Sequence, residues 1–126
     1  MALAWLVNDE AQPGVEIALE RLSEDGAVVP QLWHLEIRNS LLTAERRSRI
    51  SLDDIGECLG ALTGLPIRTD HEAGLQSAFD LAIKYGLSFY DAMYLELAKR
   101  QGADLATLDL ELGSAAVSEG LLLLPI

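Results

Sequence analysis

The chain has 126 residues, of which half are apolar, and it carries a formal net charge of −11. This length favours one domain that is large enough to bury a core, and the composition excludes a disordered chain. The acidity, with a pI near 4.4, argues against a general nucleic-acid coat, because such proteins are basic. It does not exclude an enzyme that acts on nucleic acid through a divalent cation.

The sequence favours a protein that stays in the cytoplasm. No apolar run approaches the roughly 20 residues that a membrane span needs. The opening MALAWLVNDE lacks the positive region of a signal peptide. The single cysteine, Cys58, cannot form a disulfide within the chain. We therefore expect a cytoplasmic location and no membrane partner.

Short apolar strands are expected to alternate with amphipathic helices along the chain. Helix-like segments come first, at 2–8 and from Pro13 to a stop signal at Gly26. The expected strands lie at 27–30, 65–68, 104–108 and 121–125. The remaining expected helices lie at 31–49, 52–62, 71–85, 89–101 and 110–118.

Several helix ends carry recognisable signals. Ser51 and Asp54 fit a capping box, Asp70 is the expected N-cap of the helix at 71–85, and Gly86 stands at its C-terminus. The alternation of elements is typical of a three-layer α/β domain with a parallel sheet flanked by helices. No repeat or linker divides the chain, so residues 1–126 are predicted to form a single domain.

Two aspartates stand where strands and helices meet. Asp91 fits a capping box with Ser88, and Asp109 could cap the helix at 110–118, so each taken alone is better explained as a cap. In a parallel sheet, however, the carboxyl ends of strands and the starts of the next helices line the binding crevice. Both aspartates are expected at that edge.

A third acid, Glu36, lies on the helix at 31–49. It shares a polar stripe with Asn39, Ser40 and Thr43, which suits either a solvated face or a partly buried crevice. Three carboxylates that converge on one crevice would repel each other unless a cation neutralised them. Oxygen ligands without Cys or His suit Mg²⁺ or Mn²⁺.

Other chemistries find little support in the sequence. It contains no phosphate-binding glycine loop, no zinc cluster of Cys and His, and no G-x-S-x-G elbow. His34 and His71 are isolated and are expected to be surface or helix-packing residues. The aromatic residues Phe89, Tyr90 and Tyr94 are expected to be core, because they share their helix with other apolar side chains.

The motifs E-x-x-N-x-L at 36–41, YDA-x-Y-L-x-LA at 90–98 and LATLD at 105–109, with ALAWLVNDE before them and LLLLP after, run the length of the chain. In this order they resemble a PIN domain, and specifically a VapC-type toxin ribonuclease of a toxin–antitoxin pair. The resemblance implies a fold with a five-stranded sheet, an RNA substrate and a cognate antitoxin as partner. It also leads us to expect a homodimer.

The resemblance further implies a metal-dependent endoribonuclease, which hydrolyses RNA phosphodiester bonds with Mg²⁺ or Mn²⁺. Glu36, Asp91 and Asp109 match the family's catalytic, metal-binding acids, and Asn39 and Thr107 match its polar partners. Basic clusters at two helix ends could contact the RNA backbone or could be ordinary helix-end charge. These clusters comprise Arg46, Arg47, Arg49, Lys99 and Arg100.

One family feature has no counterpart in this sequence. The family's sheet begins with a central strand that ends in an aspartate, just ahead of the residues that resemble ALAW. A late assigned start, a truncated form, or a binding module that has lost catalysis would each explain the difference. A gap would then separate AVVP from DLATL, and the exposed strand edges predict shifted packing, a swapped element or an unusual dimer.

A receiver domain that accepts phosphate is a further α/β alternative. It would need an acidic pair after its first strand, an aspartate after its third strand and a later lysine, and the sequence contains no such set.

Overall fold

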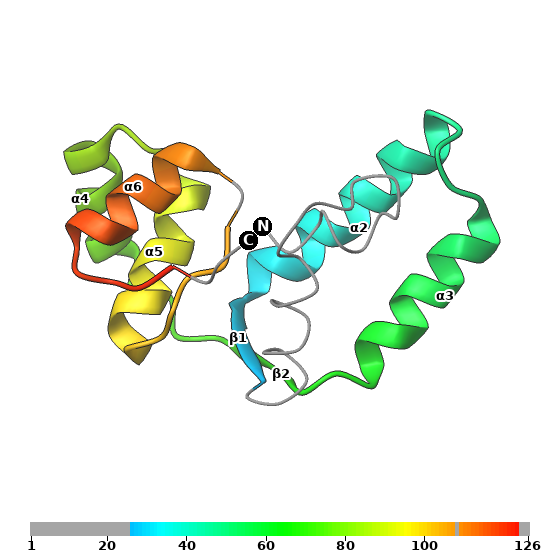
Figure 1. The fold of residues 1–126 in the computed structure, drawn as a ribbon, viewed down its shortest axis with the longest axis horizontal. Helices are drawn as coiled ribbons and strands as arrows, with labels where there is room; N and C mark the ends of the chain where they lie inside the picture. Colours follow the sequence, from blue (N-terminus) through cyan, green and yellow to red (C-terminus); the bar gives the residue numbers. More distant parts are fainter. Residues whose placement is uncertain (1–25, 108, 124–126) are drawn as a thin grey trace.

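The computed structural model describes residues 26–107 and 109–123, so the helices expected at 2–8 and from Pro13 lie outside the described residues. The described elements follow one another as an alternation of strands and helices. They are β1 (Ala27–Pro30), α2 (Gln31–Arg46), α3 (Leu52–Thr63), β2 (Ile67–Asp70), α4 (Leu75–Tyr85), α5 (Phe89–Gln101) and α6 (Leu110–Ser118). Figure 1 shows α4, α5 and α6 on one side of the strands, with α2 and α3 on the other.

The strands are parallel, as the alternation predicts. β1 pairs with β2 in a register that runs from Ala27 beside Ile67 to Pro30 beside Asp70. A separate parallel bridge joins Leu105 to Leu123. The fold is therefore α/β with a small parallel sheet.

Within the described ranges the sheet is divided into two pieces. β1 and β2 form a two-stranded sheet, and the described residues of the strands expected at 104–108 and 121–125 form the Leu105–Leu123 bridge, whereas 108 and 124–125 lie outside the described residues. This break lies between AVVP and DLATL, where the sequence comparison with the family predicted a gap. The prediction of β2 at 65–68 was two residues early, because pairing with β1 extends to Asp70.

The helix-end signals were mostly right. Ser51 Oγ accepts the Asp54 N–H at 3.1 Å, and Asp54 Oδ2 accepts the Ser51 N–H at 2.8 Å, so the capping box at α3 is complete. Gly86 ends α4 with a φ of +65°, a left-handed conformation that glycine adopts without steric cost. The expected cap at Asp70 was wrong, because Asp70 ends β2 and α4 begins only at Leu75.

The core is centred on α5, which packs against β1 and between α4 and α6. Residues Tyr94 to Ala98 of α5 are all buried. The core cluster also draws apolar side chains from α2, α4 and α6, among them Trp33, Ile37, Leu41, Leu81, Leu112 and Ala116. By contrast, α3 buries none of its residues, so it lies at the periphery. No helix in the described part of the chain is long and apolar enough to cross a membrane.

Candidate functional site

Glu36 is tied to the core of the protein through Tyr94. Glu36 is half-buried on α2, next to the fully buried Ile37, and Tyr94 is 5% exposed on α5. The Tyr94 hydroxyl donates a hydrogen bond to Glu36 Oε1, across 58 positions of the sequence. Burial, and then the Glu36 carboxylate, raises the pKa of Tyr94 above its usual value, so the hydroxyl stays protonated and donates.

Asp91 lies in the first turn of α5, but its carboxylate takes no part in the helix cap. Ser88 Oγ accepts the Asp91 N–H at 3.1 Å, but the Asp91 carboxylate does not accept the Ser88 N–H in return, as the Asp54 carboxylate accepts the Ser51 N–H at α3. Among the described residues no group donates a hydrogen bond to the Asp91 carboxylate. Asp91 also contributes to the raised pKa of Tyr94, which lies one helical turn further on.

Asp109 does act as a cap. Its Oδ1 accepts the Leu112 N–H at 2.9 Å at the start of α6, and its own N–H donates to Thr107 Oγ1 at 3.0 Å. Thr107 therefore fixes the backbone of Asp109. The second carboxylate oxygen of Asp109 is not needed for the cap, and the side chain lies in an exposed position.

The arrangement brings two of the three predicted acids around one tyrosine. In the described ranges no three His, Cys, Asp or Glu side chains lie close enough to hold a metal ion together. Mg²⁺ commonly binds through one or two carboxylates and keeps several waters. The donor chemistry of Glu36 and Asp91 therefore fits such a cation, whereas the described residues do not assemble a closed site of three carboxylates.

The basic residues named from the sequence fall into two groups. Arg46, Arg47 and Arg49 are exposed where α2 ends. Lys99 and Arg100, at the end of α5, are instead engaged with carboxylates. Lys99 Nζ lies 2.5 Å from Glu119 Oε1.

Arg100 joins two carboxylates. Its two terminal nitrogens lie 2.9 and 2.8 Å from the Asp70 carboxylate, and its Nε lies 2.7 Å from Glu96 Oε1. The hydrogen bond from Arg100 is the main cause of a lowered pKa at Asp70. RNA would have to compete with two carboxylates for this guanidinium.

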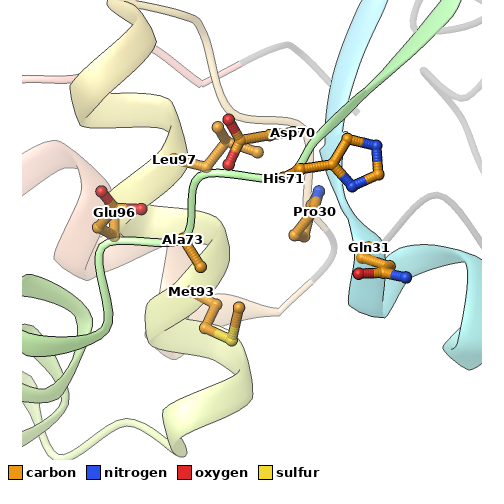
Figure 2. Close-up of a pocket in the computed structure, with 8 residues that line it drawn as sticks. All are labelled: Pro30, Gln31, Asp70, His71, Ala73, Met93, Glu96 and Leu97. Atoms are coloured by element: carbon orange, nitrogen blue, oxygen red, sulfur yellow. The ribbon is translucent and has the colours of Figure 1, made fainter.

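A shallow pocket opens at the carboxyl ends of β1 and β2, facing α5 (Figure 2). It is lined by Pro30, Gln31, Asp70, His71, Ala73, Met93, Glu96 and Leu97. None of the three predicted acids lines it. Because Arg100 already forms ion pairs with Asp70 and Glu96, this pocket is a weaker candidate than the surroundings of Tyr94.

Sequence reasoning missed the polar role of Tyr94 by assigning it to the core alone. Its ring is buried as expected, but its hydroxyl has a specific partner. A usable signal was present, because a buried tyrosine needs an acceptor where phenylalanine would not. Its spacing of three residues from Asp91 places it on the same helical face.

The chain is similar to known proteins over most of its length. A family model described as PIN domain matches residues 2–117. Ribonuclease VapC3 from Pyrobaculum aerophilum is 36% identical over 113 residues, which are 86% of this chain and 84% of that protein. The crystal structure of PAE2754 from Pyrobaculum aerophilum superposes with a TM-score of 0.69 at 21% identity, covering 90% of this chain and 80% of the other. That second likeness shows the fold alone.

Proposed function

Because the chain belongs to the PIN-domain family and is a VapC-type protein, we propose that it is a metal-dependent endoribonuclease, the toxin of a type II toxin–antitoxin pair. Its relative is a ribonuclease by name, and RNA is accordingly the proposed substrate. The observation that carries the proposal is the Asp91 carboxylate, to which no described residue donates a hydrogen bond, one helical turn before the Tyr94 that contacts Glu36.

Glu36 and Asp91 are the proposed ligands of Mg²⁺ or Mn²⁺. Asp109 would add its second carboxylate oxygen, the one that does not cap α6. When bound, such an ion lowers the pKa of a coordinated water and stabilises negative charge on a phosphate. Thr107 would hold Asp109 in place through the backbone, and Asn39, exposed one turn after Glu36, would orient a ligand or water.

The proposed contact with the RNA backbone is made mainly by Arg46, Arg47 and Arg49. Arg46 is the last residue of α2, the helix that carries Glu36, and Arg47 and Arg49 follow that helix; all three are exposed. Lys99 and Arg100 are further proposed contacts, and both form ion pairs with carboxylates. Phosphate contacts of this kind position RNA without reading its sequence.

A cognate antitoxin and a second copy of the chain are the proposed protein partners, and the cytoplasm is the proposed compartment. An exposed apolar stripe on α4 supports the existence of a protein partner. Leu75, Phe79 and Ile83 follow one another at four-residue spacing and are 59%, 53% and 70% exposed. Contiguous apolar surface of this kind is typical of interaction sites.

A catalytically impaired PIN-like binding module, which docks an antitoxin or a second subunit, is the alternative. Two observations favour it. The described residues assemble no group of three acids, and their sheet is in two pieces. A family-like first strand that ends in aspartate would add a further acid to the site and would fill the gap between the two pieces of the sheet.

The test compares the chain with a version that carries a family-like strand ending in aspartate ahead of Met1. Each is incubated with a mixed RNA pool in Mn²⁺ and in EDTA. Cleavage by either protein that EDTA stops supports the ribonuclease, and cleavage by the extended version alone identifies the strand as the missing part. Absence of cleavage by both, together with absence of Mn²⁺ binding, favours the binding module.

A further inference from the structure

We propose that Tyr94 is a positioning residue that fixes the carboxylate of Glu36 for cation binding. This inference rests on the proposed function, because it assigns Glu36 to a metal site. Tyr94 itself would touch neither the cation nor the RNA. It would act through its hydroxyl, which donates to Glu36 Oε1 and leaves Oε2 for a ligand.

The anchor is rigid because of where Tyr94 lies. Its side chain is 5% exposed and belongs to the core cluster, between Met93 and the fully buried Leu95. A ring packed in this way cannot swing, so its hydroxyl is held at one place. Glu36, in contrast, has a long side chain that would sample many rotamers in water. The hydrogen bond therefore selects one Glu36 conformation from many.

The same residue also relates the two acids to each other. Tyr94 follows Asp91 by three positions in α5, so the helix itself sets the separation between them. Glu36 reaches this pair from α2 through the Tyr94 hydroxyl. One side chain thus links a proposed ligand on α2 to a proposed ligand on α5.

A purely structural role would be satisfied by phenylalanine, which fills the same space. Tyr94→Phe removes the hydroxyl alone and is the informative substitution. Outer partners of metal ligands typically change metal affinity by about 10- to 100-fold. We therefore expect Tyr94→Phe to weaken Mn²⁺ binding by about that factor, measured on the full chain by electron paramagnetic resonance of free Mn²⁺.

A matched control exists within the chain. Tyr85 is also a tyrosine whose hydroxyl donates to a glutamate, Glu119, but that contact joins α4 to the end of α6 and involves none of the predicted ligands. Tyr85→Phe should lower thermal stability to a similar extent as Tyr94→Phe while leaving Mn²⁺ affinity unchanged. Glu36→Gln keeps an acceptor for Tyr94 and removes the charge, so it should abolish the effect of Tyr94→Phe on Mn²⁺ binding.

The outcomes separate this inference from the function on which it rests. The positioning role is overturned if Tyr94→Phe binds Mn²⁺ at least as tightly as the wild type does. It is also overturned if Tyr94→Phe binds Mn²⁺ no more weakly than Tyr85→Phe does. In both cases the proposed metal site still stands. Wild-type protein that binds no Mn²⁺ overturns both. If Tyr94→Phe alters circular dichroism, the same comparison is made with Glu36→Gln, and equal Mn²⁺ affinity in Glu36→Gln and wild type overturns the inference.

Discussion

Arg100 binds both oxygens of Asp70, at 2.9 and 2.8 Å, and so joins the end of β2 to the last turns of α5. It also contacts Glu96, whose side chain and that of Asp70 are each 8% exposed. The ion pairs therefore hold two nearly buried carboxylates together. This clamp fixes the end of β2 against α5, the helix that carries Asp91 and Tyr94.

Replacing Arg100 with methionine should destabilise the protein, because two nearly buried carboxylates would lose their counterion. Exposed ion pairs contribute up to about 1 kcal/mol, and breaking a buried pair costs about 3–5 kcal/mol. Since Arg100 is 29% exposed, we expect a loss between these limits in urea unfolding. Arg68→Met is the control, since Arg68 is exposed and its guanidinium donates to Gln101 at 3.3 Å. Equal losses in both variants would contradict the clamp.

Gly74 packs directly against this clamp. A Cβ at Gly74 would overlap Glu96 and lie 2.9 Å from its carboxyl carbon. Gly74→Ala should therefore displace Glu96 from Arg100 and cost about 1–3 kcal/mol. Gly56→Ala is the opposite case, because nothing lies within 4 Å of a Cβ in the middle of α3. That change should stabilise the protein by about 0.5–1 kcal/mol. Thermal unfolding of both variants checks the pair, and a neutral Gly74→Ala would be inconsistent with the contact.

Glu119 should make stability depend on pH in the acid range. Lys99 first, then Tyr85 and Lys84, donate to this carboxylate and lower its pKa from 4.5 to about 2. Because the folded-state pKa lies below the unfolded one, this stabilisation is complete above pH 4.5 and is lost as the pH falls toward about 2. The stability difference between wild type and Glu119→Gln should shrink over that range in urea titrations. A constant difference would refute the prediction.

The apolar stripe on α4 predicts self-association if a second copy covers it. Phe79 stands at its centre and is 53% exposed. Phe79→Glu should shift the protein to monomer in sedimentation while leaving its helix content unchanged. The exposed Leu52 on α3, which is 70% exposed, offers a matched change, Leu52→Glu. A dimer that survives Phe79→Glu, or is lost equally with Leu52→Glu, would place the interface elsewhere.

Local signals made much of the fold predictable. The complete capping box at Ser51 and Asp54 and the left-handed Gly86 are both set by a few adjacent residues. β2 was misplaced because its register depends on pairing with β1, which is 40 positions away in the first matched pair, Ala27 and Ile67. Asp70 was misread as a cap because its actual partner, Arg100, comes 30 positions later.

In the candidate site, too, the local features could be predicted from the sequence and the long-range contacts could not. The motifs identified Glu36, Asp91 and Asp109, and the incomplete capping box at Ser88 gives Asp91 a carboxylate free of the cap. The link from Glu36 to Tyr94 spans 58 positions and could not be read from periodicity. Whether the three acids act as one site is a question of tertiary packing around the break in the sheet, which the sequence pattern alone does not determine.

The central claim is that the protein cleaves RNA with a metal ion that Asp91 helps to bind, and one comparison tests it most directly. Asp91→Asn and Asp54→Asn remove the same charge from the same position in the first turns of α5 and α3. Each variant is assayed for cleavage of a mixed RNA pool in Mn²⁺, with EDTA as the blank. The substitutions are made in the given chain or in the version extended ahead of Met1, whichever cleaves RNA. The account predicts that Asp91→Asn abolishes cleavage and Asp54→Asn retains it. Full cleavage by Asp91→Asn would contradict the assignment.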